Sequence, residues 1–286
     1  MTETLIPDGP DRGLPWHYGD PFAEQRRMVA GGGALILGNQ GVLSISGTDR
    51  LIWLNEQVAE PLSGASLNSG ARLTLVGENG VVSALMYGID DGQAFWGVVD
   101  GDWPVIGYWL MTAARQSPFN VTATPWPSDQ KVAAWVGVTH PLRRRAEVAA
   151  SFASTVGLGR CVILPPDQAA ATVSDEPVGL WAYEALRIAA RCPRPPLDTD
   201  NQTTPAELSG GVAQSSRWLR LLHLDGSGDD PTPSLGTPLI LNGKTVGRLG
   251  SSAQHYEQGP IGLALVDTTV PLGTTLLAGE TAALIA

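Results

Sequence analysis

The chain has 286 residues, of which 43% are hydrophobic and 16% charged, and its formal net charge is −10. This length is enough to bury a large core, divided over about two domains. An acidic surface repels phosphate backbones, which excludes broad nucleic-acid binding, and no apolar run approaches the ~18 residues of a membrane-spanning helix. The first residues carry acids and lack an apolar run, so we expect a cytoplasmic protein without membrane contact.

Cysteines and histidines are few and scattered. Cys161 and Cys192 do not form a CxxC pair, and the four histidines show neither an HxxxH nor an HExxH pattern. We therefore expect no metal site built by this chain alone, and we expect both thiols to be buried and inert.

The first third of the chain predicts a strap, a hairpin, a helix and a meander. Residues 7–21 combine Pro, Gly and Asp with aromatic residues, which is typical of an extended strap. The run 34–45 predicts a hairpin that turns near Asn39, and apolar residues at helical spacing predict a helix over 51–62. Strands separated by Gly-rich turns then predict an antiparallel meander over 71–76, 81–89 and 94–99.

The middle of the chain alternates between helical and strand patterns. We predict a helix over 103–116, a strand over 131–138 and a second helix around 142–155. A strand at 160–164 closes this unit. Residues 181–192 then form an amphipathic helix, because acids and a proline precede it and another proline follows it.

The C-terminal part reads as strands only. A stretch rich in Pro, Thr, Ser and Gly, residues 193–216, separates it from the α+β region. Beyond this stretch, strand patterns divided by turn clusters, including Asn242-Gly243, predict a small β-barrel. The predicted strands are 218–224, 237–241, 244–251, 261–266 and 275–277.

Several strings in this order resemble one family, the YgfZ-type folate-binding proteins of actinobacterial type, relatives of the glycine-cleavage T-protein, an aminomethyltransferase. The strings are PWHYGDPFAEQR, GVLSISGTDRLIWL, WAYEALRIAAR, PLDTDNQTTPAE, LLHLDG, GKTVGRLGSSAQH and IGLALVDTTV. The resemblance implies an α+β fold of two interleaved, ferredoxin-like units around a central channel, followed by a barrel. The implied boundaries are 1–208 for the α+β region, with units of roughly 1–130 and 131–208, then 209–216 for a linker and 217–286 for the barrel.

The resemblance also implies a function. Such proteins bind tetrahydrofolate or a derivative in the channel and support the maturation or repair of iron-sulfur enzymes, and through them tRNA modification. An iron-sulfur enzyme or an assembly protein is the implied partner. Two other readings stay open: a scaffold that has lost the ligand and acts through protein contacts, and an active aminomethyltransferase.

Three departures from the family bear on these readings. Relatives carry a KGCYxGQE segment after a P-x-E element, whereas here only nine residues, LSGGVAQSS, separate Glu207 from Arg217, and the motif cysteine has no counterpart. Ser83 stands where the T-protein has its catalytic aspartate, and a hydroxyl cannot supply that negative charge. Ala189 stands where the T-protein has a glutamate suited to grip a pterin. Transferase chemistry is therefore not expected.

The resemblance nominates Arg187, Glu207 and Ser83 for the folate site. Arg187 lies in the family's Leu-Arg element, where a guanidinium holds the folate glutamate tail; the alternative is a helix-surface ion pair with Glu184. Glu207, the acid of the P-x-E element, receives a pterin N–H or has only a structural role. Asp198 and Asp200 are candidates for acid-base work or for capping a turn.

Aromatic and basic residues supply the remaining candidates. Trp53 and Tyr183 can stack on a flat heterocycle, although large aromatic residues are more often part of a core. Arg143, Arg144 and Arg145 form a compact basic run that contacts tRNA or an acidic partner, or is solvated surface.

Overall fold

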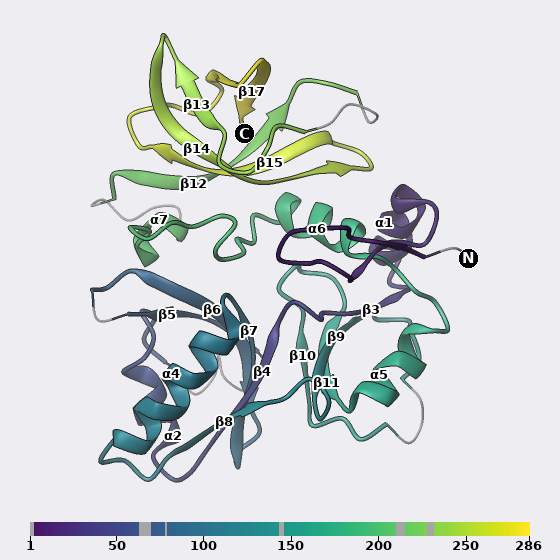
Figure 1. The fold of residues 1–286 in the computed structure, drawn as a ribbon, viewed down its shortest axis with the longest axis vertical. Helices are drawn as coiled ribbons and strands as arrows, with labels where there is room; N and C mark the ends of the chain where they lie inside the picture. Colours follow the sequence, from purple (N-terminus) through teal and green to yellow (C-terminus); the bar gives the residue numbers. More distant parts are fainter. Residues whose placement is uncertain (1–2, 63–69, 78, 143–145, 210–214, 228–231) are drawn as a thin grey trace.

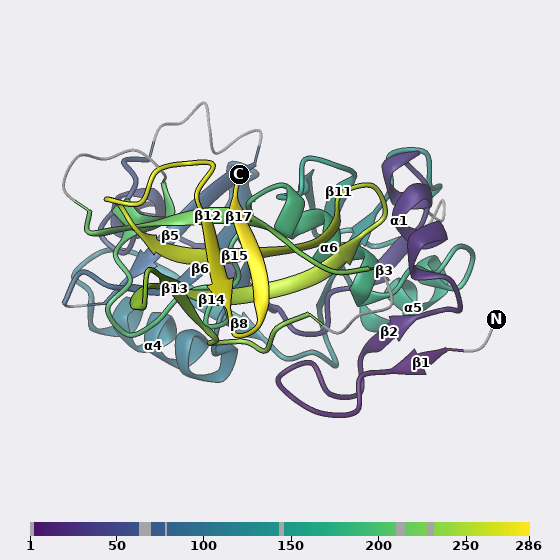
Figure 2. The same cartoon turned by 90° about the horizontal axis from the view of Figure 1, so that it is seen from above.

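The computed structural model describes residues 3–62, 70–77, 79–142, 146–209, 215–227 and 232–286. These residues form two antiparallel sheets, each with helices against it, and a closed barrel above both (Figure 1). Seen from above, the barrel strands lie across the two units (Figure 2). Arg143, Arg144 and Arg145 lie outside the described residues, as does most of the predicted linker.

The first unit is a five-stranded antiparallel sheet in the order β5-β6-β7-β4-β8. Two helices, α2 (Arg50–Asn55) and α4 (Trp103–Gln116), contribute buried apolar side chains to the core on one face of this sheet. The predicted meander is confirmed as β5 to β7. The strands are β4 (Gly41–Ser46), β5 (Ala71–Val76), β6 (Val82–Asp90), β7 (Ala94–Asp100) and β8 (Thr122–Trp126).

The second unit is a four-stranded antiparallel sheet in the order β10-β11-β9-β3. The helix α5 (Pro166–Val173) shares a buried apolar cluster with one of its faces. Its strands are β3 (Ala34–Ile36), β9 (Val132–Val136), β10 (Ala150–Ala153) and β11 (Arg160–Leu164). Because β3 precedes the first unit in sequence and pairs with β9 in the second, the two units are interleaved.

Two local predictions are wrong. The run 34–45 is not a hairpin, since β3 pairs with β9 whereas β4 pairs with β7 and β8. The described residues of 142–155 form no helix, and the end of that segment is β10. Burial alternates along β10 with the period of a strand, and Phe152 points into the core, so tertiary pairing overrides the helical propensity of the alanines.

A layer of helices lies between the sheets and the barrel (Figure 1). It consists of α1 (Pro21–Val29), α6 (Leu180–Ala189) and the short α7 (Pro205–Leu208). Nearly every side chain of α6 is buried, as expected for a helix with protein on both sides. None of the helices in the described part of the chain is long and apolar enough to cross a membrane.

The N-terminal strap is a two-stranded hairpin of β1 (Thr4–Leu5) and β2 (Pro15–His17). It is attached to α6 by aromatic stacking, because the rings of Trp16 and Trp181 lie 5.3 Å apart. The strap therefore fixes the start of the chain against the central helix.

The predicted barrel is confirmed as a closed ring in the order β12-β15-β14-β13-β16-β17. At the tip of β13–β14, Asn242 and Gly243 have φ values of 50° and 77°, which is the backbone of a tight hairpin turn. The strands are β12 (Arg217–Leu224), β13 (Pro238–Leu241), β14 (Lys244–His255), β15 (Gly259–Asp267), β16 (Thr275–Ala278) and β17 (Thr281–Ile285).

Candidate functional site

Arg187 is buried at the centre of the molecule and is fully bonded to the protein. Its Nε and one Nη donate to the carboxylate of Glu184 at 2.9 and 2.5 Å. The other N–H groups donate to Cys192 O at 3.0 Å, to Asp198 Oδ2 at 2.9 Å and to Ser251 Oγ at 2.6 Å. A guanidinium has five N–H groups, and all five are used here. Arg187 can bind a ligand only by giving up one of these bonds.

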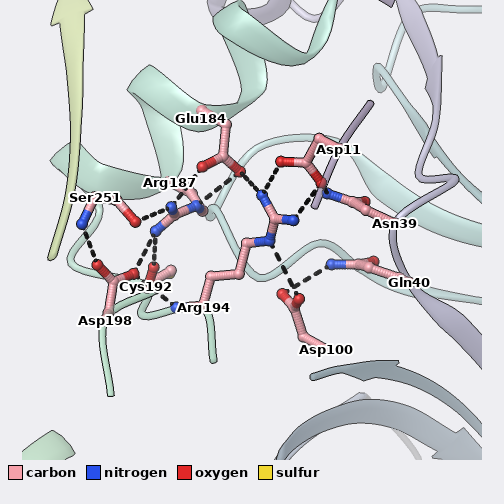
Figure 3. A network of polar contacts seen from close by, with 10 residues as sticks. All are labelled: Asp11, Asn39, Gln40, Asp100, Glu184, Arg187, Cys192, Arg194, Asp198 and Ser251. Carbon is pink, nitrogen blue, oxygen red and sulfur yellow. Dashed lines mark hydrogen bonds and ion pairs between the residues drawn. The ribbon is translucent and has the colours of Figure 1, made fainter. Parts of the chain in front are cut away.

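Arg194 forms a second cationic centre beside Arg187 (Figure 3). Its guanidinium makes a two-pronged contact with the carboxylate of Asp11 from the N-terminal strap. It also forms ion pairs at 3.5 Å with Glu184 of α6 and with Asp100 at the end of β7. Arg194 therefore links the strap, the central helix and the first sheet. We name these two arginines, together with Asp11, Asp100, Glu184 and Asp198, the central ion network.

Burial and charge act in opposite directions on the carboxylates of the central ion network. Burial raises the pKa of Asp100 to about 6, against the opposing charges of Arg194 and Arg187. Burial also tends to raise the pKa of Glu184, but the charges of the same two arginines outweigh it and lower the pKa. Of these two carboxylates, Asp100 is the one whose negative charge is less well stabilised.

A cavity at the centre is small. Its volume is about 10 Å³, the space of a single water, whereas ligand pockets usually have roughly 300–1,000 Å³. Tyr183, one of the predicted residues, lines it, and burial raises the pKa of its phenol well above the ordinary value. The lining residues are Leu37, Gln40, Tyr87, Val98, Phe152, Ser154, Thr155, Cys161 and Tyr183.

Glu207 has a structural role at the start of α7. Its carboxylate accepts the backbone N–H of Thr204 at 2.7 Å, which caps the helix. It also pairs at 2.8 Å with Arg217 of β12, and Arg217 in turn pairs with Asp200 at 2.6 Å. Asp200 accepts the backbone N–H of Gln202 as well, so it caps a turn. These contacts attach the segment before the barrel to the first barrel strand.

The structure brings Ser83 near the segment of Glu207 but separates Trp53 from Tyr183. Val82, beside Ser83 in β6, donates its N–H to the carbonyl of Thr203 at 2.8 Å, directly before α7. Trp53 of α2 is 1% exposed and packs in the core that α2 and α4 share with one face of the first sheet, whereas Tyr183 of α6 belongs to the cluster on the opposite face of that sheet. The five predicted residues therefore do not line one cavity.

The fold is shared with a solved enzyme. The structure of glycine cleavage system aminomethyltransferase T from Bartonella henselae matches 99% of this chain and 92% of its own, with a TM-score of 0.79 and 17% sequence identity. This chain has the T-protein fold. No family model and no curated protein matches the sequence, and at this identity the likeness shows the fold alone. The predicted fold class, α+β units with a C-terminal barrel, is confirmed.

Sequence reasoning missed three residues that hold the centre of this T-protein fold: Asp11, Asp100 and Arg194. Asp11 and Arg194 are 183 residues apart, and no local pattern connects them. For Arg187, the partner Glu184 was identified from the spacing of three residues, but the pair is buried and not on the surface as that alternative assumed. No cluster of His, Cys, Asp and Glu that could hold a metal ion occurs among the described residues.

Proposed function

We propose that this protein is a folate-binding accessory protein of the YgfZ type, acting in the cytosol in the maintenance of iron-sulfur enzymes and thereby in tRNA modification. The observation that carries the proposal is the T-protein fold over 99% of the chain, found in a sequence whose motifs resemble that family and are spread over nearly the whole chain. An iron-sulfur enzyme or assembly protein is the proposed partner.

Aminomethyl transfer is not part of this proposal. Ser83 stands where T-proteins have their catalytic aspartate, and a hydroxyl cannot replace a carboxylate beside a reacting amine. The acids of the centre are not substitutes, because Glu184 and Asp198 are both bonded to Arg187. The proposed protein binds a folate without reacting with it.

A ligand-free scaffold is the second candidate, and specific observations favour it. Arg187 has used all five of its N–H groups inside the protein, and the cavity beside Tyr183 has about 10 Å³. A cavity of this volume is far smaller than a folate, so a folate can bind there only if the lining side chains move apart and the cavity opens. A scaffold needs no such opening and acts through its surface.

A calorimetric titration with 5-formyltetrahydrofolate separates the two candidates. The folate proposal predicts saturable one-to-one binding with a micromolar Kd, roughly −8 kcal/mol. Ser154→Leu places a larger side chain in the central cavity and should weaken this binding at least about tenfold. The matched control is Ala170→Phe, on the exposed side of α5, which should leave folate binding unchanged. No saturable binding up to millimolar ligand would favour the scaffold.

A further inference from the structure

The tip of the N-terminal strap, residues 7–13, turns one acid toward the centre of the molecule. The residues of the tip are exposed to solvent except Asp11, which is half-buried. Gly9 and Gly13 lie on either side of Asp11 with φ values of 81° and 83°, a left-handed backbone that glycine adopts without a steric penalty. The tip therefore directs a single carboxylate inward while its neighbours face water.

Asp11 attaches this tip to the rest of the protein. Among the described residues, the hydrogen bonds and ion pairs between the tip and residues outside the strap all end on the Asp11 carboxylate. The base of the strap is held separately, because Trp16 stacks on Trp181 and the N–H of Tyr18 donates to Glu24 at 2.7 Å. The tip can therefore leave the centre while the base stays in place.

The strap also leaves open space on its inner side. A cavity of about 640 Å³ lies between the strap, the edge strand β3 and the C-terminal end of α5. Leu14 and Pro15 of the strap line it together with Leu35 of β3 and Val173 of α5. Because protein interiors are normally close-packed, a cavity of this volume shows that the strap packs loosely on this side.

Three donors converge on the carboxylate of Asp11 (Figure 3). The two Nη atoms of Arg194 donate to its two oxygens, and Nδ2 of Asn39 donates to Oδ1 at 3.1 Å. Arg194 is 5% exposed and is held from its other side by ion pairs at 3.5 Å with Glu184 and Asp100. The planar fork that binds a carboxylate is thus fixed by residues other than Asp11.

Two polar atoms of this site have no hydrogen bond. Oδ1 of Asn39 and Nε of Arg194 are buried and have no hydrogen-bond partner among the described residues. Nε lies 3.5 Å from Asp100, which is longer than a normal hydrogen bond. An ionised carboxylate has no proton to donate, so Asp11 cannot satisfy the acceptor Oδ1 of Asn39. An occupant with a donor next to its carboxylate satisfies both the guanidinium and this amide.

A hydroxyl fits this requirement better than an ammonium. Glu184 and Asp100, the other acids beside Arg194, are already paired with that arginine, so an ammonium group has no carboxylate of its own there. A primary amide presents its N–H and its C=O side by side. This pair matches one oxygen of a carboxylate and a hydroxyl on the next carbon.

We propose that Arg194 and Asn39 form a binding site for a small 2-hydroxycarboxylate, and that Asp11 fills this site while no ligand is bound. The carboxylate of the ligand replaces that of Asp11 on the guanidinium, its hydroxyl donates to Oδ1 of Asn39, and the tip of the strap moves outward. Asp11 is tethered beside the site, so it competes at a high effective concentration. This inference goes beyond the proposed function and does not depend on a folate.

The test is a calorimetric titration of the full chain with sodium glycolate, and with acetate as the match that lacks the hydroxyl, at an ionic strength held constant with sodium chloride. Asp11→Ala should bind glycolate with a Kd below about 5 mM, and acetate at least about fivefold more weakly. The wild type should bind glycolate at least about tenfold more weakly than Asp11→Ala. Equal affinity of wild type and Asp11→Ala would overturn the proposal, as would no saturable binding to the variant up to about 100 mM.

Two further variants locate the binding. Asn39→Ala, added to Asp11→Ala, removes the amide and should weaken glycolate binding at least about tenfold. Arg12→Ala is the matched control, because Arg12 is an exposed residue of the same tip and should leave glycolate binding as in the wild type. Unchanged affinity after loss of Asn39 would contradict the site. Glycolate is far smaller than a folate, so these titrations are informative whether or not the folate titration shows binding.

Hydrogen exchange tests the displacement of the tip. The backbone N–H of Arg12 donates to Gly9 and that of Leu14 to Asp11, so both amides report on the order of the tip. About 200 mM glycolate should raise their exchange rates in the wild type at least about twofold over the same concentration of sodium chloride. Unchanged rates in a protein that binds glycolate would show that Asp11 keeps its place.

Discussion

The centre of the molecule and the outer edge of β3 differ in their charged residues and in the volume of the cavity that each contains. At the centre, two arginines lie among four carboxylates from separate parts of the chain, and the cavity beside them has about 10 Å³. At the edge of β3, a cavity of about 640 Å³ has two acids and no cation in its lining. Ion pairs between buried side chains hold distant segments together at the centre, whereas the edge of β3 leaves open space between the elements that line the cavity.

The largest effect is expected from breaking the central ion network. Arg187→Ala leaves Glu184 and Asp198 buried without their main cation, so the free energy of unfolding should fall by about 3–5 kcal/mol. Urea denaturation at pH 7 measures this loss. Arg217→Ala is the matched control, since its pairs with Asp200 and Glu207 are partly exposed, and it should cost about 1 kcal/mol. An equal loss of the free energy of unfolding in the two variants would mean that burying the central ion network does not increase its contribution to stability.

A second effect depends on pH. The pKa of Asp100 is raised from 3.8 to about 6, so the folded state binds its proton more tightly than the unfolded state. The stability that protonated Asp100 contributes is fully present below about pH 4 and is lost as the pH rises through about 6. By pH 8 the free energy of unfolding has fallen by roughly 3 kcal/mol. Asp100→Asn, which stays neutral and still accepts the N–H of Gln40, avoids this loss.

The measurement for Asp100 is denaturation of wild type and Asp100→Asn at several pH values. The variant should be the more stable protein at pH 8, and the difference between the two should shrink as the pH falls to 5. A difference that is independent of pH would show that Asp100 titrates in the ordinary range for an aspartate.

The smallest effects are expected from variants that place a larger side chain in each of the two cavities. Ser154→Leu should lower the free energy of unfolding by about 1–3 kcal/mol, because about 10 Å³ cannot accept the added carbons. Ala170→Phe should change it by less than about 0.5 kcal/mol, because the ring enters a cavity from an exposed position. Thermal denaturation of both variants in one buffer compares them, and a large loss for Ala170→Phe would mean that the pocket closes in solution.

Local patterns predicted much of the fold. The turn Asn242-Gly243 and the periodicity around it placed the hairpin at the tip of β13–β14, since both residues tolerate positive φ. The central helix was predicted within a few residues of α6. The helix α1 was missed although Asp20 and Pro21 give an N-terminal signal, and here the side chain of Asp20 accepts two backbone N–H groups.

The site could not be predicted to the same extent, because its contacts connect distant parts of the chain. The spacing of Glu184 and Arg187 within one helix indicated their pairing. Ser251, which also accepts from Arg187, is 64 residues further on and lies in a barrel strand. The pairing of β3 with β9 is equally long-range and replaced the hairpin that the sequence predicted.

The pair of Asp11 and Arg194 also has a consequence for synthesis of the chain. At the roughly 5–20 residues per second of translation, Asp11 leaves the ribosome roughly 10–35 s before the arginine that neutralises it. Until Arg194 has been made, Asp11 and then Asp100 lack this cation, so the strap and the first sheet cannot be joined through it. The N-terminal segment therefore reaches its final position only after about two thirds of the chain has been made.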